Sequence, residues 1–185
     1  MRATALLLCA AALAAAQAPA PADNQAYTLW AKHKPGTAVT LRTVSETAGN
    51  KSESLLTQTL VERTDDKVVV EMSAVNKVGG QEFKAPGVKV THLRKPPASP
   101  ATTPPTGAAA PPKPVVETAE DTVTVAGVKY KATRTKSTVT TNGLTVESTG
   151  WTSDEVPGGV LKSVSKTTGP YATTSTMELV EFKKP

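Results

Sequence analysis

The sequence predicts a mainly β protein: a single antiparallel sheet of roughly eight to ten short strands, with a short N-terminal helix and a long proline-rich loop. Three observations support this prediction. Short segments alternate apolar and polar residues between turn signals. The apolar residues are mostly Val and Ala, no Ile is present, and only 4% of the 185 residues are aromatic. One segment holds eight of the 15 prolines. Strand pairing, and not a thick aromatic core, is therefore expected to build the fold.

Residues 1–16 are expected to be a secretory signal peptide. Arg2 gives a short positive start, an apolar run follows, and small residues end it in A-x-A style. Cleavage is expected after Ala16, with Ala22 as the alternative. No later apolar run approaches the roughly 20 residues that span a bilayer, so at most a peripheral membrane contact is expected. The predicted location is periplasmic or extracellular.

Removal of this segment changes the composition. Cys9 is the only cysteine, so the mature chain would lack disulfides, thiol nucleophiles and cysteine metal sites. The net charge of +5 becomes +4, and its charges are interleaved along both halves. Nucleic-acid binding is not expected, because it favours clustered Lys and Arg with aromatic stacking partners.

The domain organisation follows from the prolines. Residues 95–114 are expected to be a linker or surface loop, since they contain no aromatic or β-branched apolar residue. Residues 23–94 form a first β lobe with the helix, and residues 115–185 form a second. The pattern allows two separate lobes or one sheet whose halves are joined by an insertion, and we expect the second lobe to complete the same sheet.

The elements of the first lobe are bounded by turn signals. A helix is expected over 24–34, and strands over 39–47, 55–63, 68–75 and 81–84. Turns are expected at Pro35-Gly36, Gly49-Asn50, Thr64-Asp65-Asp66 and Gly79-Gly80.

The second lobe repeats this style. Strands are expected over 122–125, 128–133, 144–153, 160–166 and 172–183. Asn142-Gly143 is the strongest hairpin signal in the chain. Val156-Pro157-Gly158-Gly159 places Pro and Gly where a type II turn needs them.

Few residues could support catalysis. His33 and His92 are the only imidazoles, and neither lies in a metal-ligand spacing. Adjacent acids occur at 65–66, 120–121 and 154–155, where a hydrolase with paired carboxylates is a minor alternative to solvated turns. We expect no enzyme activity, no catalytic residue, no cofactor and no metal.

Binding remains more open. The larger aromatics could stack on a glycan or fill the core, and the core reading is favoured because so few are present. They are Tyr27, Trp30, Tyr130, Trp151 and Tyr171.

The motifs at 30–36 (WAKHKPG), 151–163 (WTSDEVPGGVLKS) and 178–182 (ELVEF) resemble those of small, uncharacterised secreted proteins of planctomycete-type bacteria. The resemblance covers nearly all of the mature chain outside 95–114. The chain differs at His33, where Phe is usual, and at Ala132, where Cys is frequent. The family-motif turn contains Asp154, Glu155, Pro157, Gly158 and Gly159. This resemblance implies no catalytic residue.

More distantly, the order of motifs is similar to that of lipoprotein-carrier-like proteins. This resemblance implies a strongly curved, half-barrel-like sheet with the helix near its concave face. In this carrier-like version, the exported, noncatalytic protein that the signal peptide and the scarcity of catalytic groups predict would bind a lipid or other apolar small molecule inside the sheet. The alternative is a structural or adhesion module that contacts envelope components, including glycans through exposed aromatics. The candidate lining residues, which are equally candidates for plain core, are Trp30, Leu41, Leu60, Val70, Met72, Tyr130, Val146 and Trp151.

Overall fold

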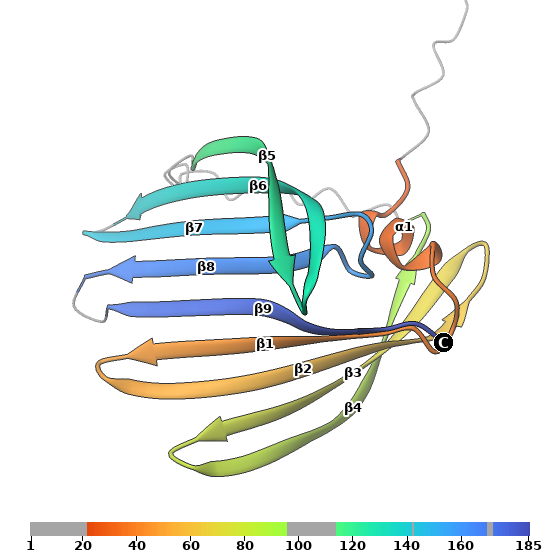
Figure 1. The fold of residues 1–185 in the computed structure, drawn as a ribbon, viewed down its shortest axis with the longest axis horizontal. Coiled ribbons are helices and arrows are strands. Elements are labelled where there is room, and N and C mark those ends of the chain that lie inside the picture. Colours follow the sequence, from red (N-terminus) through yellow and green to blue (C-terminus); the bar gives the residue numbers. More distant parts are fainter. Residues whose placement is uncertain (1–21, 96–113, 142, 170–171) are drawn as a thin grey trace, which may run out of the picture.

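In the part of the chain that the structure describes, the fold is one open antiparallel sheet with a single short helix (Figure 1). The computed structural model describes residues 22–95, 114–141, 143–169 and 172–185. The predicted signal peptide, most of the predicted linker and Tyr171 lie outside these residues. Helix α1 spans Gln25–Ala31, and within the described residues no helix is long and apolar enough to cross a membrane.

Nine strands alternate in direction across the sheet. In chain order they are β1 (Ala38–Thr47), β2 (Asn50–Arg63), β3 (Lys67–Val78), β4 (Gln81–Leu93), β5 (Val115–Val125), β6 (Val128–Thr141), β7 (Leu144–Thr152), β8 (Val160–Thr168) and β9 (Thr173–Lys183).

The order across the sheet is β4-β3-β2-β1-β9-β8-β7-β6-β5. The first and last strands therefore pair in the middle, and the strands that flank the proline-rich segment form the two opposite edges. β1 and β9 are aligned over their full lengths, with a bulge between Thr40 and Leu41. Both predicted lobes thus belong to one sheet, which confirms the mainly β prediction and decides between the two arrangements that the sequence allowed.

The sheet is curved most strongly at the β5 edge. The first half of β5 runs beside β6 along the outer edge, and its second half turns across the front of the sheet (Figure 1). There it contacts β8 and β9. α1 lies on the same side, near the other edge, and contacts β3 and β4. The helix and the β5–β6 hairpin therefore cover one end of a shared concave face.

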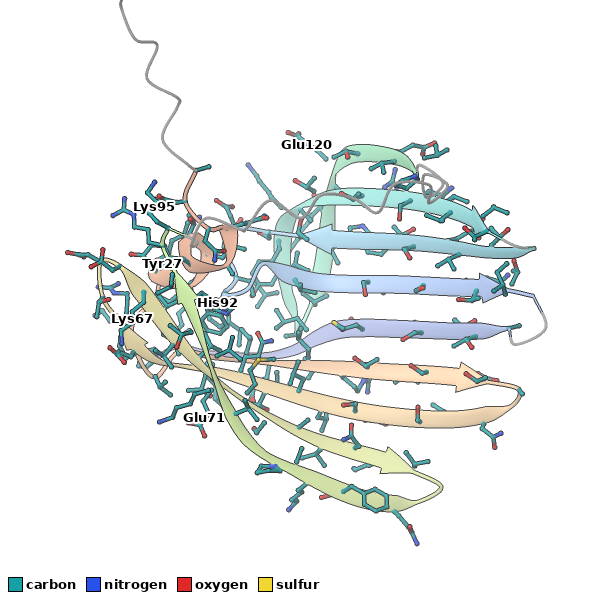
Figure 2. All side chains as sticks on the ribbon, turned by 180° about the vertical axis from the view of Figure 1, so that it is seen from behind. Tyr27, Lys67, Glu71, His92, Lys95 and Glu120 are labelled. Atoms are coloured by element: carbon teal, nitrogen blue, oxygen red, sulfur yellow. The ribbon has the colours of Figure 1, made fainter. Side chains whose placement is uncertain are left out.

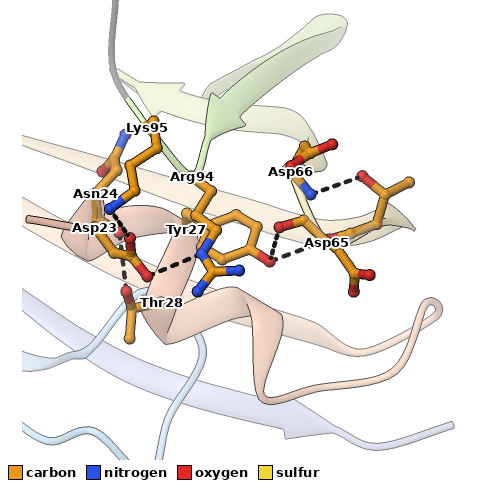
Figure 3. A network of polar contacts seen from close by, with 9 residues as sticks. Asp23, Asn24, Tyr27, Thr28, Asp65, Asp66, Arg94 and Lys95 are labelled. Atoms are coloured by element: carbon orange, nitrogen blue, oxygen red, sulfur yellow. Dashed lines mark hydrogen bonds and ion pairs between the residues drawn. The ribbon is translucent and has the colours of Figure 1, made fainter. Parts of the chain in front are cut away.

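The start of α1 is tied to the ends of other elements (Figure 3). The Asn24 side chain accepts a hydrogen bond from the Ala26 amide at 3.0 Å, which is an N-cap. The Asp23 carboxylate bonds Arg94 at 2.9 Å and Lys95 at 2.8 Å, just after β4. The Tyr27 hydroxyl donates to the Asp65 carbonyl at 2.8 Å in the β2–β3 turn. Seven residues form a marginal helix alone, so these contacts and its buried face hold it in place.

The hydrophobic core lies between the sheet and these two covers. It combines Trp30 of α1 with Leu60, Leu161 and Leu179 of the sheet and Val125 of the β5–β6 hairpin, each no more than 3% exposed. Figure 2 shows side chains crowded at the α1 end, around Tyr27, and sparser toward the far hairpins. The fold is therefore two layers thick at one end only.

Several predicted boundaries were wrong at the ends of elements. α1 ends at Ala31 and not at Lys34, because a residue before Pro35 is biased away from helical conformation. The β1–β2 turn uses Ala48 and Gly49, both with positive φ, so Asn50 already pairs with Thr47. This is one residue earlier than predicted.

Both edge strands are longer than predicted. β4 continues past Lys84 because a bulge absorbs Pro86 and Gly87, and an edge strand tolerates a missing amide. β5 starts at Val115, seven residues before the predicted start. Its first half is wholly exposed, so no apolar alternation marks it.

Candidate functional site

Most of the predicted lining residues lie in the core. Trp30, Leu41, Leu60, Val70 and Tyr130 are at most 6% exposed and pack together. A residue such as Leu60, with no exposed surface, offers nothing to a ligand, so the geometry favours the core reading of these five.

Three predicted lining residues are partly exposed. Met72 and Trp151 pack against the core from its margin. The Trp151 indole donates a hydrogen bond to the Asp121 carboxylate at 2.8 Å. Val146 is half-buried and lies outside the core cluster, toward the β6–β7 hairpin. Of the five aromatics, Tyr27, Trp30 and Tyr130 are buried, so they form no exposed stacking platform.

The turn at 156–159 packs against α1. The Gly159 amide donates to the Val156 carbonyl at 2.9 Å, and Gly158 has a φ of +73°, as a type II turn requires. A Cβ on Gly158 would lie 3.5 Å from Trp30 Nε1, and one on Gly159 would lie 2.9 Å from Leu29 Cδ1. Gly158 is thus required by its backbone conformation, whereas the missing side chain of Gly159 allows the turn to approach Leu29 closely.

The charged residues of this turn point outward. Asp154 forms an ion pair with Lys32 at 3.0 Å, which holds the pKa of Asp154 below its usual value. Glu155 is exposed, and its amide donates to the Ser153 hydroxyl at 3.4 Å. Pro157 is fully buried beneath them. The motif predicted from the sequence is thus a structural joint between α1 and the β7–β8 connection.

An open groove of about 1070 Å³ lies beside this joint. α1, the bend of β5 and β6, and the β7–β8 connection form its walls. Its lining residues are Gln25, Ala26, Leu29, Glu120, Asp121, Thr122, Lys131, Ala132, Thr133, Thr152, Ser153, Asp154, Gly158 and Gly159.

The groove brings together acids from two of the predicted carboxylate pairs. Hydrogen bonds from the Trp151 indole and the Thr122 amide lower the pKa of Asp121, as Lys32 does for Asp154. Both are therefore ionised acceptors at neutral pH. A glycosidase needs one carboxyl group with a raised pKa to act as an acid. The electrostatics of Asp121 and Asp154 support ligand contact and not acid catalysis.

Another surface emerges only from the strand register. Six serines lie directly opposite one another across six neighbouring strands, and we call them the serine row. From β2 to β6 they are Ser52, Ser45, Ser175, Ser165, Ser148 and Ser137. Directly paired residues of antiparallel strands share a face, and neighbouring strands are about 4.8 Å apart. The row therefore runs for about 24 Å across the sheet.

On β1, β2, β8 and β9 the serine row lies on the same side of the strands as buried core leucines, whereas on β6 the buried Tyr130 and Ala132 alternate with Ser137. Every second residue of a strand faces the same side, so Leu41, Thr43 and Ser45 share one side of β1. Ser175, Met177 and Leu179 share one side of β9 in the same way. Leu41 and Leu179 are buried, whereas all six serines are only half-buried. Neither α1 nor the β5–β6 hairpin covers this part of the face.

Two further register rows flank the serine row, and we call the three rows together the uncharged face. On the core side lie Ser54, Thr43, Met177, Ser163, Gly150 and Thr135. On the hairpin side lie Asn50, Thr47, Thr173, Thr167, Val146 and Val139. None of these eighteen positions carries a charge.

The positions that alternate with these rows are very different. The same six strands place eighteen other residues on the opposite side of the sheet, and ten of those are charged: Arg42, Glu46, Lys51, Glu53, Arg134, Lys136, Glu147, Lys162, Lys166 and Glu178. The two faces of one sheet layer thus differ in kind, since one is strongly solvated and the other is uncharged and rich in hydroxyl groups.

The hydroxyls of the uncharged face bond to one another. Ser45 and Ser175 are 2.9 Å apart, Thr47 and Thr173 are 3.0 Å apart, and Ser148 and Ser165 are 3.5 Å apart. A hydroxyl has one donor and two acceptor sites, so each retains capacity for a ligand. The face can therefore contact an uncharged polar molecule along its length.

Sequence reasoning missed this surface. Each strand contributes an ordinary alternation of small polar residues, and only pairing across strands far apart in the sequence aligns them. A usable signal was nevertheless present. In β8 the alternate positions after Leu161 are Ser163, Ser165 and Thr167, and in β9 those before Leu179 are Thr173, Ser175 and Met177, so neither set carries a charge.

No protein-family model, curated protein or solved structure matches this chain.

Proposed function

We propose that this chain is a noncatalytic exported protein of the cell envelope, a structural or adhesion module that contacts an uncharged, hydroxyl-bearing polymer such as a glycan. The binding surface in this proposal is the uncharged face. The observation that carries it is the difference between eighteen uncharged positions on one side of the layer and ten charged positions on the other.

The chemistry of the face favours a neutral polar ligand. Serine and threonine hydroxyls exchange donor and acceptor roles with sugar hydroxyls, and small side chains leave the sheet accessible. A charged polymer would find no counter-charge there. A lipid chain would find few large apolar side chains, since Met177, Val139 and Val146 are the only ones among the eighteen.

The apolar-ligand version is a second candidate, and one feature favours it. A small cavity of about 470 Å³ lies beside Tyr130, with Val128 and Phe182 in its wall and Glu155 and Lys184 also lining it. Apolar-ligand binding is the weaker candidate, because most of the predicted lining residues are buried in the core.

Insoluble envelope polysaccharide provides the test. The full-length protein is mixed with purified cell-wall polysaccharide, the polymer is sedimented, and the bound fraction is measured. The variant S148E/S165E places two charges in the serine row and should weaken retention about tenfold or more, a change of about 1.4 kcal/mol or more.

The same two strands supply a matched control. Thr149 and Val164 also face each other across β7 and β8, but on the opposite side of the sheet. T149E/V164E should bind as the unchanged protein does. Equal binding by both variants, or no binding by the unchanged protein, contradicts the proposal. Native mass spectrometry that finds lipid on a protein unable to bind polysaccharide supports the second candidate.

A further inference from the structure

The two edges of the sheet differ in charge. β5 contains Glu117, Glu120 and Asp121 and no Lys or Arg, which gives a net charge of −3. β4 contains Glu82, Lys84 and Lys89, which gives +1. Unlike edges attract and like edges repel, so electrostatics favours contact between β4 of one molecule and β5 of another over either like pairing.

The edges also expose large apolar side chains. Among the described residues, five of the nine exposed large hydrophobics lie on β4 and β5: Phe83, Val88, Leu93, Val115 and Val116. Val115 is 67% exposed and Val88 is 60% exposed. Edge strands of monomeric proteins usually avoid such residues, because the unpaired backbone groups invite another strand.

The two edges are protected to different degrees. β4 contains Pro86 in its bulge, which interrupts the edge but leaves six uninterrupted residues, 88–93. β5 contains no Pro, Gly or Lys, and its first six residues, 115–120, are all exposed. In the described part of the chain, β5 is paired on one side only. Each edge thus offers an open segment of six residues.

From these observations we infer that a second copy of this chain adds to the sheet, with residues 88–93 of β4 pairing with residues 115–120 of β5 in the neighbouring molecule. Every pairing within the sheet is antiparallel, so β4 and β5 run in the same direction. Copies related by translation along the sheet would pair these edges in parallel and keep their uncharged faces on one side.

This contact uses two different surfaces, so it is heterologous and leaves one free edge at each end. Repetition gives a ring or an open filament. A six-residue ladder is only about 20 Å long, which places the interface among the small, weak ones. Association is therefore expected to depend strongly on concentration, and to weaken as salt screens the charges.

Charge-swapped variants test the inference without relying on one mutant. E117K/E120K makes the β5 edge +1, like β4, and K84E/K89E makes the β4 edge −3, like β5. Each variant alone should remain monomeric in sedimentation velocity at concentrations where the unchanged full-length protein associates. An equimolar mixture should associate again, because each edge then meets an opposite charge.

A control reverses two charges away from the edges. Glu147 and Lys166 face each other on the interior strands β7 and β8, so E147K/K166E should associate as the unchanged protein does. Circular dichroism confirms that every variant keeps its sheet. The inference is overturned if the unchanged protein is monomeric at its solubility limit, if the edge variants still associate alone, or if their mixture stays monomeric.

Discussion

The surroundings of the His33 ring disfavour its protonated, positively charged form. The imidazole lies perpendicular to the Phe182 ring with the ring centroids 5.9 Å apart, and its buried Nε2 has no hydrogen-bond partner in the described part of the chain. Burial lowers the pKa of His33, and the nearby positive charges of Lys184 and Lys32 lower it further. The Arg63 guanidinium, which donates to the His33 carbonyl at 3.1 Å, also lies close by.

This environment predicts a pH-dependent stability. The unfolded chain takes up a proton on His33 near pH 6.5, whereas the folded protein does so only at lower pH. His33 therefore contributes stability above about pH 6.5, and that contribution is lost as the pH falls through the folded-state pKa. In urea unfolding across this pH range, the free energy of unfolding of H33F should fall less with decreasing pH than that of the unchanged protein. K184Q should reduce this fall only in part, because burial is the larger cause of the low pKa of His33.

The outcome for H33F decides this prediction. Phenylalanine fills the same space and cannot be protonated, so the comparison isolates the titration from the packing. Equal pH slopes for H33F and the unchanged protein would show that His33 is not the group responsible.

The contact between α1 and the β7–β8 connection depends on a glycine. Gly159 has a φ of +77° and would place a Cβ 2.9 Å from Leu29. Gly127 has nearly the same φ, +75°, with nothing within 4 Å. Alanine at either position costs about 1–2 kcal/mol for the left-handed backbone, but only at Gly159 must a neighbouring side chain, that of Leu29, also shift to make room.

G159A should therefore lower the free energy of unfolding more than G127A does, measured by urea denaturation. Adding L29A to G159A should recover part of the difference, since it removes the clashing methyl groups. Equal losses in the two single variants would contradict the role of this turn as the seat of α1.

The same elements show what sequence patterns can predict. Gly143, Gly79-Gly80 and the Pro157-Gly158 turn mark real strand ends, because local backbone conformation decides them, while Asn142 lies outside the described residues. Residues 115–121 of β5 escaped the prediction, which covered only 122–125, because the exposed start of an edge strand has no buried side to set an alternation. The serine row could not be predicted, because it depends on the register of β1 with β9, which are over 120 residues apart. Local signals fix turns, whereas the candidate surface is a property of pairing.

At the scale of the whole molecule, the two halves of the chain meet through more than one kind of contact. β1 and β9 share ten register pairs at the centre of the sheet. Trp30 of the first half packs near Gly158 of the second, and Lys32 pairs with Asp154 at 3.0 Å. The core also combines both halves, since Leu41 and Leu179 are paired and buried. These contacts do not depend on the chain between the edges.

The folded protein should therefore survive a cut within residues 96–113, because closing a loop of this length contributes only a slowly growing entropic term. With a specific protease site placed there, the cleaved protein should elute in gel filtration as one species that contains both fragments and keeps its circular dichroism spectrum. The melting temperature of the cleaved protein should then rise with protein concentration, because unfolding now separates two chains. The melting temperature of the uncut protein should not change with concentration. This comparison uses the charge-swapped variant E117K/E120K, in which association through the β5 edge is suppressed. Fragments that separate under native conditions would show that the central β1–β9 ladder and the shared core are too weak to hold the halves together.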